Sequence, residues 1–347
     1  MANSGYGSPG LSPPGMTETL VHAYTPLLVW VSLGLLAFRF VPQSFPRLLG
    51  RGLYWVGVPL QILAFTRRTD FSQSIGWAPL MAIAALLLGL AFGWTGLRWS
   101  QHQRDRTQQS TADLADLADL APALEPPRWL SEAPSQGSLL LSAMLGNTGF
   151  VGLTVLPEFV PDTQLGWLVF YNMTQNVLGT YGLGILLSCH FGGLSEAPSW
   201  PQKLRTMLSV PSLWAFTLGV ATHSVKLPSV LETNLQRSLW FVIPCALLLM
   251  GMRLSQLNGL TSLRLALLPS AIKMFVLPAA IGGVATAAGL VQDARLSMVL
   301  MAGMPTAFAG LILAEEYSLD HELIASSIAL TTPMLLLTLP LWLQLFG

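Results

Sequence analysis

The chain has 347 residues, of which 52% are hydrophobic and only 10% are charged, and its mean hydropathy is +0.57. Soluble domains carry about 25% charged residues, so this composition excludes a water-soluble globular protein and predicts a chain immersed in a lipid bilayer. The net charge of zero argues against a nucleic-acid partner, which would require a basic surface. Cys189 and Cys245 lack ligand-like spacing, so neither a metal nor another cofactor is expected.

The first 19 residues are rich in Gly, Pro and Ser and contain no Lys or Arg, which predicts a disordered leader over 1–19 rather than a signal peptide. Ten later segments approach the roughly 20 apolar residues that a membrane span needs. In chain order they are 20–38, 48–66, 76–97, 138–157, 165–188, 206–225, 238–256, 265–288, 296–316 and 323–346. Residues 99–136 predict a solvated, partly helical cytoplasmic linker, and residues 189–205 predict a cytoplasmic loop.

The positive charges orient these spans. Most of the 17 Lys and Arg residues fall in the loops that are cytoplasmic when the N-terminus is outside. Because cytoplasmic loops are enriched in Lys and Arg, we expect a multi-pass protein of the plasma (inner) membrane with both termini outside the cytoplasm.

The two halves of the chain repeat each other. Three residues of spans one and two recur at one constant offset in spans six and seven: Pro26, Gly34 and Pro59 match Pro211, Gly219 and Pro244. NTGFVGLTVLPEFVPD (147–162) also matches PTAFAGLILAEEYSLD (305–320). Five spans per half give the second half the opposite sense in the membrane, which is an inverted repeat typical of secondary transporters. The predicted fold is therefore an all-α polytopic membrane protein with ten transmembrane helices in two inverted five-helix repeats, residues 20–188 and 206–347.

Spans four and nine are predicted to be broken helices that cross each other. Asn147 lies among three glycines in span four, and Pro305 lies between two glycines in span nine. Broken backbone at membrane depth is tolerated only beside protein or a watery cavity, and matching breaks in inverted repeats point to a binding site. The restarted helices would offer N–H groups to an anion. The predicted substrate-binding residues are Asn147, Thr148, Gly149, Phe150, Pro305, Thr306, Ala307 and Lys273.

Lys273 is the single charged residue deep within a predicted span. Such a residue is functional by default, and three roles remain open: attracting the anion, capping carbonyls at a helix break, or snorkelling to an interface. No Asp or Glu lies in the middle of a span, which disfavours a cation or proton exchanger. The sequence also contains no arrangement of a nucleophile with a general base, so an enzyme is not expected.

These segments resemble the auxin efflux carrier family, which includes plant auxin exporters and bacterial carriers. The resemblance rests on LGNTGFVGL, GMPTAFAGLILAEEYSLDHELIASSIALTTPMLLLTLPLW and VPSLWAFTLGVATHSVKLPSVL. It implies a scaffold of spans one, two, six and seven, often dimeric, and a transport domain of the other six spans. It places a substrate carboxylate where Asn147 to Phe150 cross Pro305 to Phe308. Span three lacks the acid and the lysine that support the site in plant auxin carriers.

The leading hypothesis is a secondary transporter that moves a small organic anion, a carboxylate, by alternating access. Its expected partners are that substrate, the lipid bilayer and a second copy bound through spans one, two, six and seven. One alternative is a sodium-coupled symporter of the bile-acid type, with Asn147, Thr148 and Gln175 as ion ligands. Another is a non-transporting membrane sensor with the same fold, in which the linker would be the output element.

Overall fold

The computed structural model describes residues 16–69, 76–112, 131–192, 201, 205, 208–256, 263–290 and 292–347. Most of the predicted leader, the middle of the predicted 99–136 linker and part of the 189–205 loop lie outside these described residues. Within the described ranges the regular structure is helical, and one isolated antiparallel bridge joins Gly146 to Thr306.

The first half of the chain forms a series of helices that follow the predicted spans one to five. They are α1 (Met16–Ala37), α2 (Phe45–Gly52), η1 (Leu53–Gly57), α3 (Val58–Arg68), α4 (Trp77–Ala112), α5 (Ala133–Met144), η4 (Thr148–Gly152), α6 (Leu153–Val155), η5 (Leu156–Glu158), η6 (Asp162–Gln164), α7 (Leu165–Thr174), η7 (Gln175–Gly184) and α8 (Ile185–Phe191). Helix α4 is much longer than the predicted span 76–97. It continues to Ala112, through polar residues of the predicted linker.

The second half follows spans six to ten in the same way. Its helices are α10 (Pro211–Ala221), α11 (Ser229–Ser255), α12 (Leu263–Ala271), η9 (Ile272–Val276), α13 (Leu277–Ala287), α14 (Gln292–Ala302), α15 (Ala309–Tyr317) and α16 (His321–Phe346). Helix α10, which corresponds to predicted span six, begins at Pro211 and not at residue 206. Proline is favoured in the first turn of a helix because its missing N–H is not needed there.

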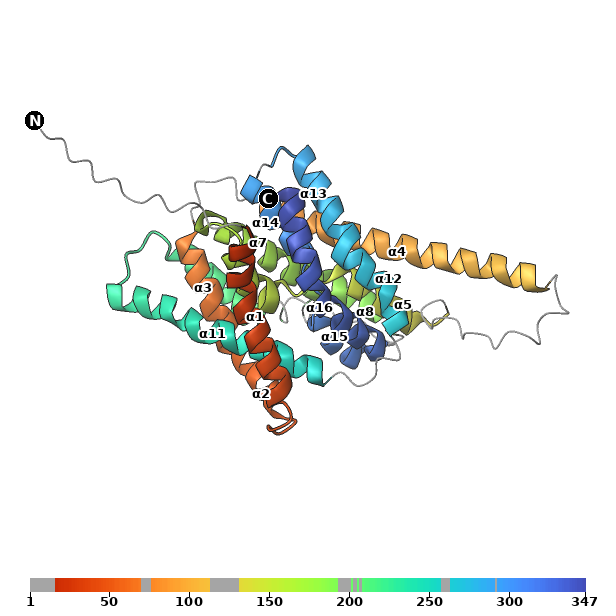
Figure 1. Ribbon diagram of the computed structural model, residues 1–347, viewed down its shortest axis with the longest axis horizontal. Helices are drawn as coiled ribbons and strands as arrows, with labels where there is room; N and C mark the ends of the chain where they lie inside the picture. Colours follow the sequence, from red (N-terminus) through yellow and green to blue (C-terminus); the bar gives the residue numbers. More distant parts are fainter. Residues whose placement is uncertain are drawn as a thin grey trace, which may run out of the picture.

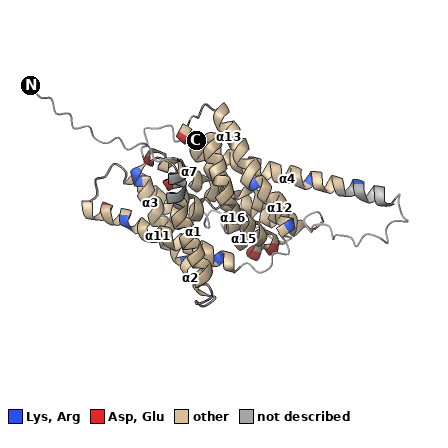
Figure 2. Cartoon of the chain, viewed as in Figure 1, with Lys and Arg blue, Asp and Glu red and all other residues tan. Residues whose placement is uncertain are grey.

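Five of these helices or abutting helix runs are long and apolar enough to cross a membrane. They are Phe45–Arg68, Trp77–Gln103, Ser229–Ser255, Leu263–Ala287 and His321–Phe346. Figure 2 shows the charged residues mainly near helix ends and on projecting segments, with uncharged helices between them. Large apolar side chains such as Trp240 and Phe241 are 85% and 74% exposed. The chain is therefore a polytopic, all-α membrane protein.

The helices form two groups. Figure 1 shows α1, α2, α3 and α11 together on one side and α12, α13 and α16 on the other. Within the first group α1 packs along α11, and a further helix, α10, packs along α3 of that group. A Cβ atom added to Gly34 would lie 2.2 Å from the carbonyl oxygen of Leu248, and one added to Gly251 would lie 2.1 Å from that of Val31. Only glycine allows this backbone approach, which is common between membrane helices.

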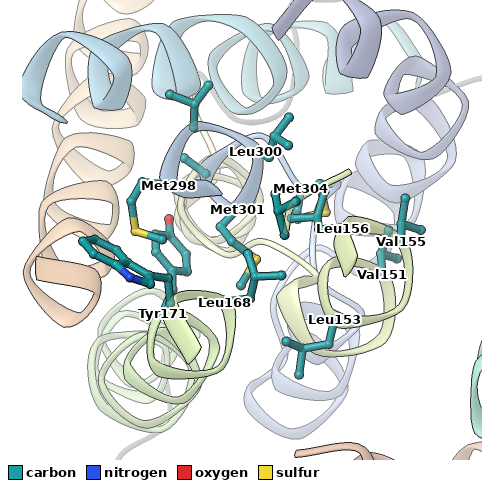
Figure 3. Packing of buried hydrophobic residues seen from close by; sticks show 14 of the residues in the cluster. Val151, Leu153, Val155, Leu156, Leu168, Tyr171, Met298, Leu300, Met301 and Met304 are labelled. Carbon is teal, nitrogen blue, oxygen red and sulfur yellow. The ribbon is translucent and has the colours of Figure 1, made fainter. Parts of the chain in front are cut away.

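The buried core joins the two broken spans. In Figure 3 Met301 lies between Leu168 of α7 and the side chains of the span-four segment that begins at η4, with Met298 beside Tyr171 and Met304 beside Leu156. The same cluster contains Leu168 and Leu153, which are fully buried. Because methionine is flexible and fills irregular gaps, it packs closely against these uneven, interrupted helices. The core thus holds α14 against both neighbours at the depth of the breaks.

Asp320 fixes the start of α16 and ties it to α5. Its carboxylate accepts hydrogen bonds from the Leu323 amide at 3.0 Å and from Ser135 Oγ at 2.7 Å. Loss of an N-cap side chain costs about 1 kcal/mol, so we expect Asp320→Ala to lower the thermal unfolding midpoint in detergent measurably. Asp293→Ala, an acid near the start of α14, is the matched control. Equal midpoints for the two variants would show that the cap contributes nothing.

Candidate functional site

The site is built on two helix interruptions that hydrogen-bond to each other. The α5 helix ends at Met144, after which Leu145 is extended (φ −85°, ψ 121°), and α14 ends at Ala302. The Asn147 amide donates to the carbonyl oxygen of Pro305 at 2.7 Å, and the Ala307 amide donates to that of Leu145 at 3.0 Å. The two breaks therefore satisfy part of each other's backbone, which is required of buried polar groups.

Side chains satisfy further groups at this crossing. Asn147 Oδ1 accepts the Phe150 amide at 3.2 Å and so caps η4. Thr306 Oγ1 donates to the Ser142 carbonyl at 3.1 Å, and the Thr306 amide donates to Thr331 Oγ1 at 3.0 Å. The polar cost of breaking two helices at this depth is thus offset by partners within the protein.

The fifth span adds a polar network beside the crossing. Thr148 Oγ1 donates to Asn172 Oδ1 at 2.8 Å, and Asn176 Nδ2 donates to the same oxygen at 2.8 Å. Gln175 Nε2 donates to the Gly146 carbonyl at 2.6 Å and approaches Thr148 Oγ1 at 3.4 Å. Among the described residues no group of three or more His, Cys, Asp or Glu could hold a metal ion.

Lys273 lies behind the crossing. It is 1% exposed, and its Nζ donates to the Ala302 carbonyl at 2.9 Å, at the end of α14. Its Nζ would also lie 2.8 Å from a Cβ added to Gly146. Lys273 belongs to η9, a π-helical turn directly before α13. Pro278 in α13 has no backbone N–H, so a backbone carbonyl one turn earlier lacks its helical hydrogen-bond donor. Of the three roles left open by the sequence, the structure shows carbonyl capping, and it excludes snorkelling because the side chain is enclosed by protein.

A cavity of about 550 Å³ opens on the other side of the crossing. It is lined by Arg47, Gly50, Arg51, Tyr54, Val58, Gly146, Asn147, Thr148, Gly149, Phe150, Asn172, Asn176, Thr180, Tyr181, Val210, Ser212, Leu249, Arg253, Ala307, Phe308, Ala309 and Ile312. Five predicted site residues are therefore brought together on its wall. They are Asn147, Thr148, Gly149, Phe150 and Ala307. The other three, Pro305, Thr306 and Lys273, do not line it and instead support the crossing from within.

Three arginines on this wall were not among the predicted site residues. Arg47 and Arg51 come from α2, and Arg253 comes from the last turn of α11. No Asp or Glu is among the lining residues. A signal for two of them exists in the sequence, because Arg51 and Arg253 interrupt the apolar stretches of spans two and seven. Arginines in loops also set the orientation of a protein in the membrane, and the sequence does not show which arginines face a cavity.

The rest of the wall is largely apolar and aromatic. Phe150 and Phe308 stand at the two restarted helices, and Leu249 and Ile312 come from α11 and α15. The hydroxyls of Tyr54 and Tyr181, which both line the cavity, lie 3.1 Å apart and form a hydrogen bond between η1 and η7. The cavity thus combines cationic side chains and amides with surfaces suited to a carbon skeleton.

Comparisons with known proteins agree with this architecture. Residues 199–343 match a family model described as membrane transport protein. The chain is 26% identical over 332 residues to an uncharacterized transporter of Methanothermobacter thermautotrophicus, which covers 94% of this chain and 97% of the relative. It is 27% identical over 213 residues to an uncharacterized transporter of Methanocaldococcus jannaschii, covering 59% of this chain and 67% of that relative. Taken with the helical fold and its apolar spans, these matches identify the chain as a membrane transporter, and they agree with the expected resemblance to the auxin efflux carrier family.

Proposed function

We propose that the protein is a secondary transporter that carries a small organic anion, a carboxylate, across the membrane by alternating access. The observation that carries this proposal is the cavity beside the crossing, which has three arginines and no acid on its wall. Such a surface concentrates anions, because a cleft lined by one sign of charge focuses the field of its side chains. The apolar side chains on the rest of the cavity wall suit the hydrocarbon part of an organic acid.

In this proposal the carboxylate binds next to Asn147. The Oδ1 atom of that side chain already accepts the Phe150 amide, so its Nδ2 group is the part that would donate to an anion. Asn172 and Asn176 add amides to the same wall. Lys273 acts indirectly by holding the end of α14, and hence the second break, in place.

Alternating access would use two inverted repeats of five spans. Two contacts support this symmetry. Gly34 packs closely on Gly251, while Gly219, its match in the repeat, packs on Thr66, which matches Gly251 at the same offset. Asn147 and Pro305, the matched first residues of 147–162 and 305–320, are also hydrogen-bonded to each other. Both relations are expected when one two-fold axis relates the halves.

The membrane context follows from the same proposal. With both termini outside the cytoplasm, the side of the molecule that carries Arg47 and Arg253 faces inward, so the cavity is open to the cytoplasm. The exposed apolar side chains of spans one, two, six and seven, among them Trp240 on α11 and Trp214 on α10, face lipid or a second copy. We therefore retain a plasma-membrane homodimer as part of the proposal.

Purified protein in liposomes tests this function. Radiolabelled mono- and dicarboxylates and indole acids should be screened for uptake, with a membrane potential or a proton or sodium gradient imposed in turn. At least one acid is expected to enter above protein-free liposomes and to compete with its unlabelled form. Monodisperse protein without flux for any acid contradicts the proposal, and flux that requires sodium favours the bile-acid type of symporter.

A further inference from the structure

Two arginines at matching positions of the repeat are in different electrostatic situations. Arg68 ends α3, and Arg253 lies in the last turn of α11 at the offset that also relates Pro59 to Pro244. Arg68 forms an ion pair with Asp162 of η6 at 2.6 Å. Arg253 lines the cavity, and among the residues that the structure describes no acid lies within ion-pair distance of it. One position of the repeat is thus paired while its counterpart is not.

The Arg68 side of the molecule is closed by further contacts between the proposed scaffold and the proposed transport domain. A Cβ atom added to Gly166, at the start of α7, would lie 2.2 Å from Thr69 Cγ2. The buried Gln61 Nε2 of α3 donates to the Leu153 carbonyl of α6 at 2.9 Å. The Thr69 side chain thus packs on the backbone of α7, and a buried hydrogen bond joins α3 to α6 on this side of the molecule.

On the Arg253 side the corresponding acids stand away from the arginine. Glu315 lies on α15 about one helical turn after Ile312, which lines the cavity together with Arg253. The strict counterpart of Asp162 is Asp320, but its carboxylate is held by Ser135 and by the Leu323 amide. Glu315 is 72% exposed in its side chain and lies 3.5 Å from His321, a loose contact. Glu315 is therefore the acid free to approach Arg253.

We propose that Arg68 and Arg253 are repeat-related gate residues that pair alternately with acids of the transport domain. The inference rests on alternating access as proposed above. In the present state the Arg68–Asp162 gate is closed and the Arg253 gate is open. When the cavity closes on the Arg253 side, Arg253 pairs with Glu315, and the Arg68–Asp162 pair separates.

The weakness of the closed pair suits this role. The side chains of Arg68 and Asp162 are 42% and 68% exposed, and exposed ion pairs contribute little to stability. A gate has to open in every cycle, so a strong buried pair would trap one state. An exposed pair shifts the balance of the two states without fixing it.

Accessibility of the cavity from each face tests the proposal without any substrate. A single cysteine at Ala309 on the cavity wall, in a background with Cys189→Ser and Cys245→Ser, should be labelled with a membrane-impermeant thiol reagent applied to either face of sealed vesicles. The parent protein is expected to react mainly from the Arg253 face. Arg68→Gln should raise the labelling rate from the opposite face roughly two- to fivefold, the range that loss of one exposed ion pair allows. Arg237→Gln, an exposed arginine of α11, is the control with the same charge change.

The second gate is tested in the same assay. Glu315→Gln should raise labelling from the Arg253 face and lower it from the Arg68 face, because the state closed at Arg253 loses its pair. Glu316→Gln, the adjacent exposed acid, should change neither. The exchange Arg68→Asp with Asp162→Arg should restore the parent pattern that Arg68→Gln alone disturbs.

The outcomes separate this inference from the proposed function. If Arg68→Gln labels like Arg237→Gln from both faces, and Glu315→Gln labels like Glu316→Gln, the gates are wrong even when anion flux is present. If the labelling shifts as expected while no organic acid is transported, the gates stand and the proposed substrate class fails. A variant that is not monodisperse in detergent is replaced by Arg68→Lys, which should show the parent pattern if a positive charge suffices.

Discussion

Replacement of Lys273 by methionine should lower the free energy of unfolding by about 1–3 kcal/mol, the cost of leaving a buried carbonyl without its hydrogen-bond donor. Met fills similar space but cannot donate to the Ala302 carbonyl, which lies at a helix end and loses its 2.9 Å partner. The lysine lies against Gly146 as well, so its loss should loosen the crossing. We expect fewer functional molecules with a lower thermal unfolding midpoint in detergent.

Anion affinity distinguishes this capping role from direct binding. Because Lys273 does not line the cavity, the Kd of a transported acid measured on the folded fraction should stay unchanged in Lys273→Met. Lys226→Met, which removes an exposed lysine, serves as the control and should affect neither stability nor affinity. A large rise in Kd with an unchanged unfolding midpoint would mean that Lys273 binds the anion itself.

Neutralising Arg47 and Arg51 together should raise the Kd of a transported organic anion about tenfold, equivalent to roughly 1.4 kcal/mol. Both side chains line the cavity from α2, and no lining acid compensates their charge. Because both are exposed and salt screens such charges, the difference from the parent protein should shrink as ionic strength rises. Arg47→Gln with Arg51→Gln leaves Arg253 in place, so the gate is not altered directly.

Equilibrium binding at two salt concentrations measures this effect. Arg264→Gln with Arg237→Gln removes the same charge from exposed positions that do not line the cavity, and it should leave the Kd near the parent value. If the two double variants bind the anion equally well, the arginines of α2 serve orientation in the membrane and not recognition.

The sequence located the helix breaks without any tertiary information. Gly, Asn and Pro act on the backbone of their own turn, so Asn147 and Pro305 predict interruptions at once, and α5 and α14 do end just before them. The ten predicted segments likewise overlap helices of the structure, because a run of apolar residues is a local property. Helix ends were less predictable, since α4 continues past its apolar stretch as a polar helix.

The sequence by itself determined immersion in the bilayer, the helical class and the position of the two interruptions. The alignment of the two repeats also predicted which residues of spans four and nine lie at the crossing. Only the tertiary structure decided that Lys273 caps the end of α14 from behind and that Arg47, Arg51 and Arg253 face the cavity. The physical reason is that charge acts through space. A lysine within an apolar helix and an arginine at a helix end have the same sequence signature whether they meet a carbonyl, lipid headgroups or a ligand. The packing of distant helices alone selects the partner.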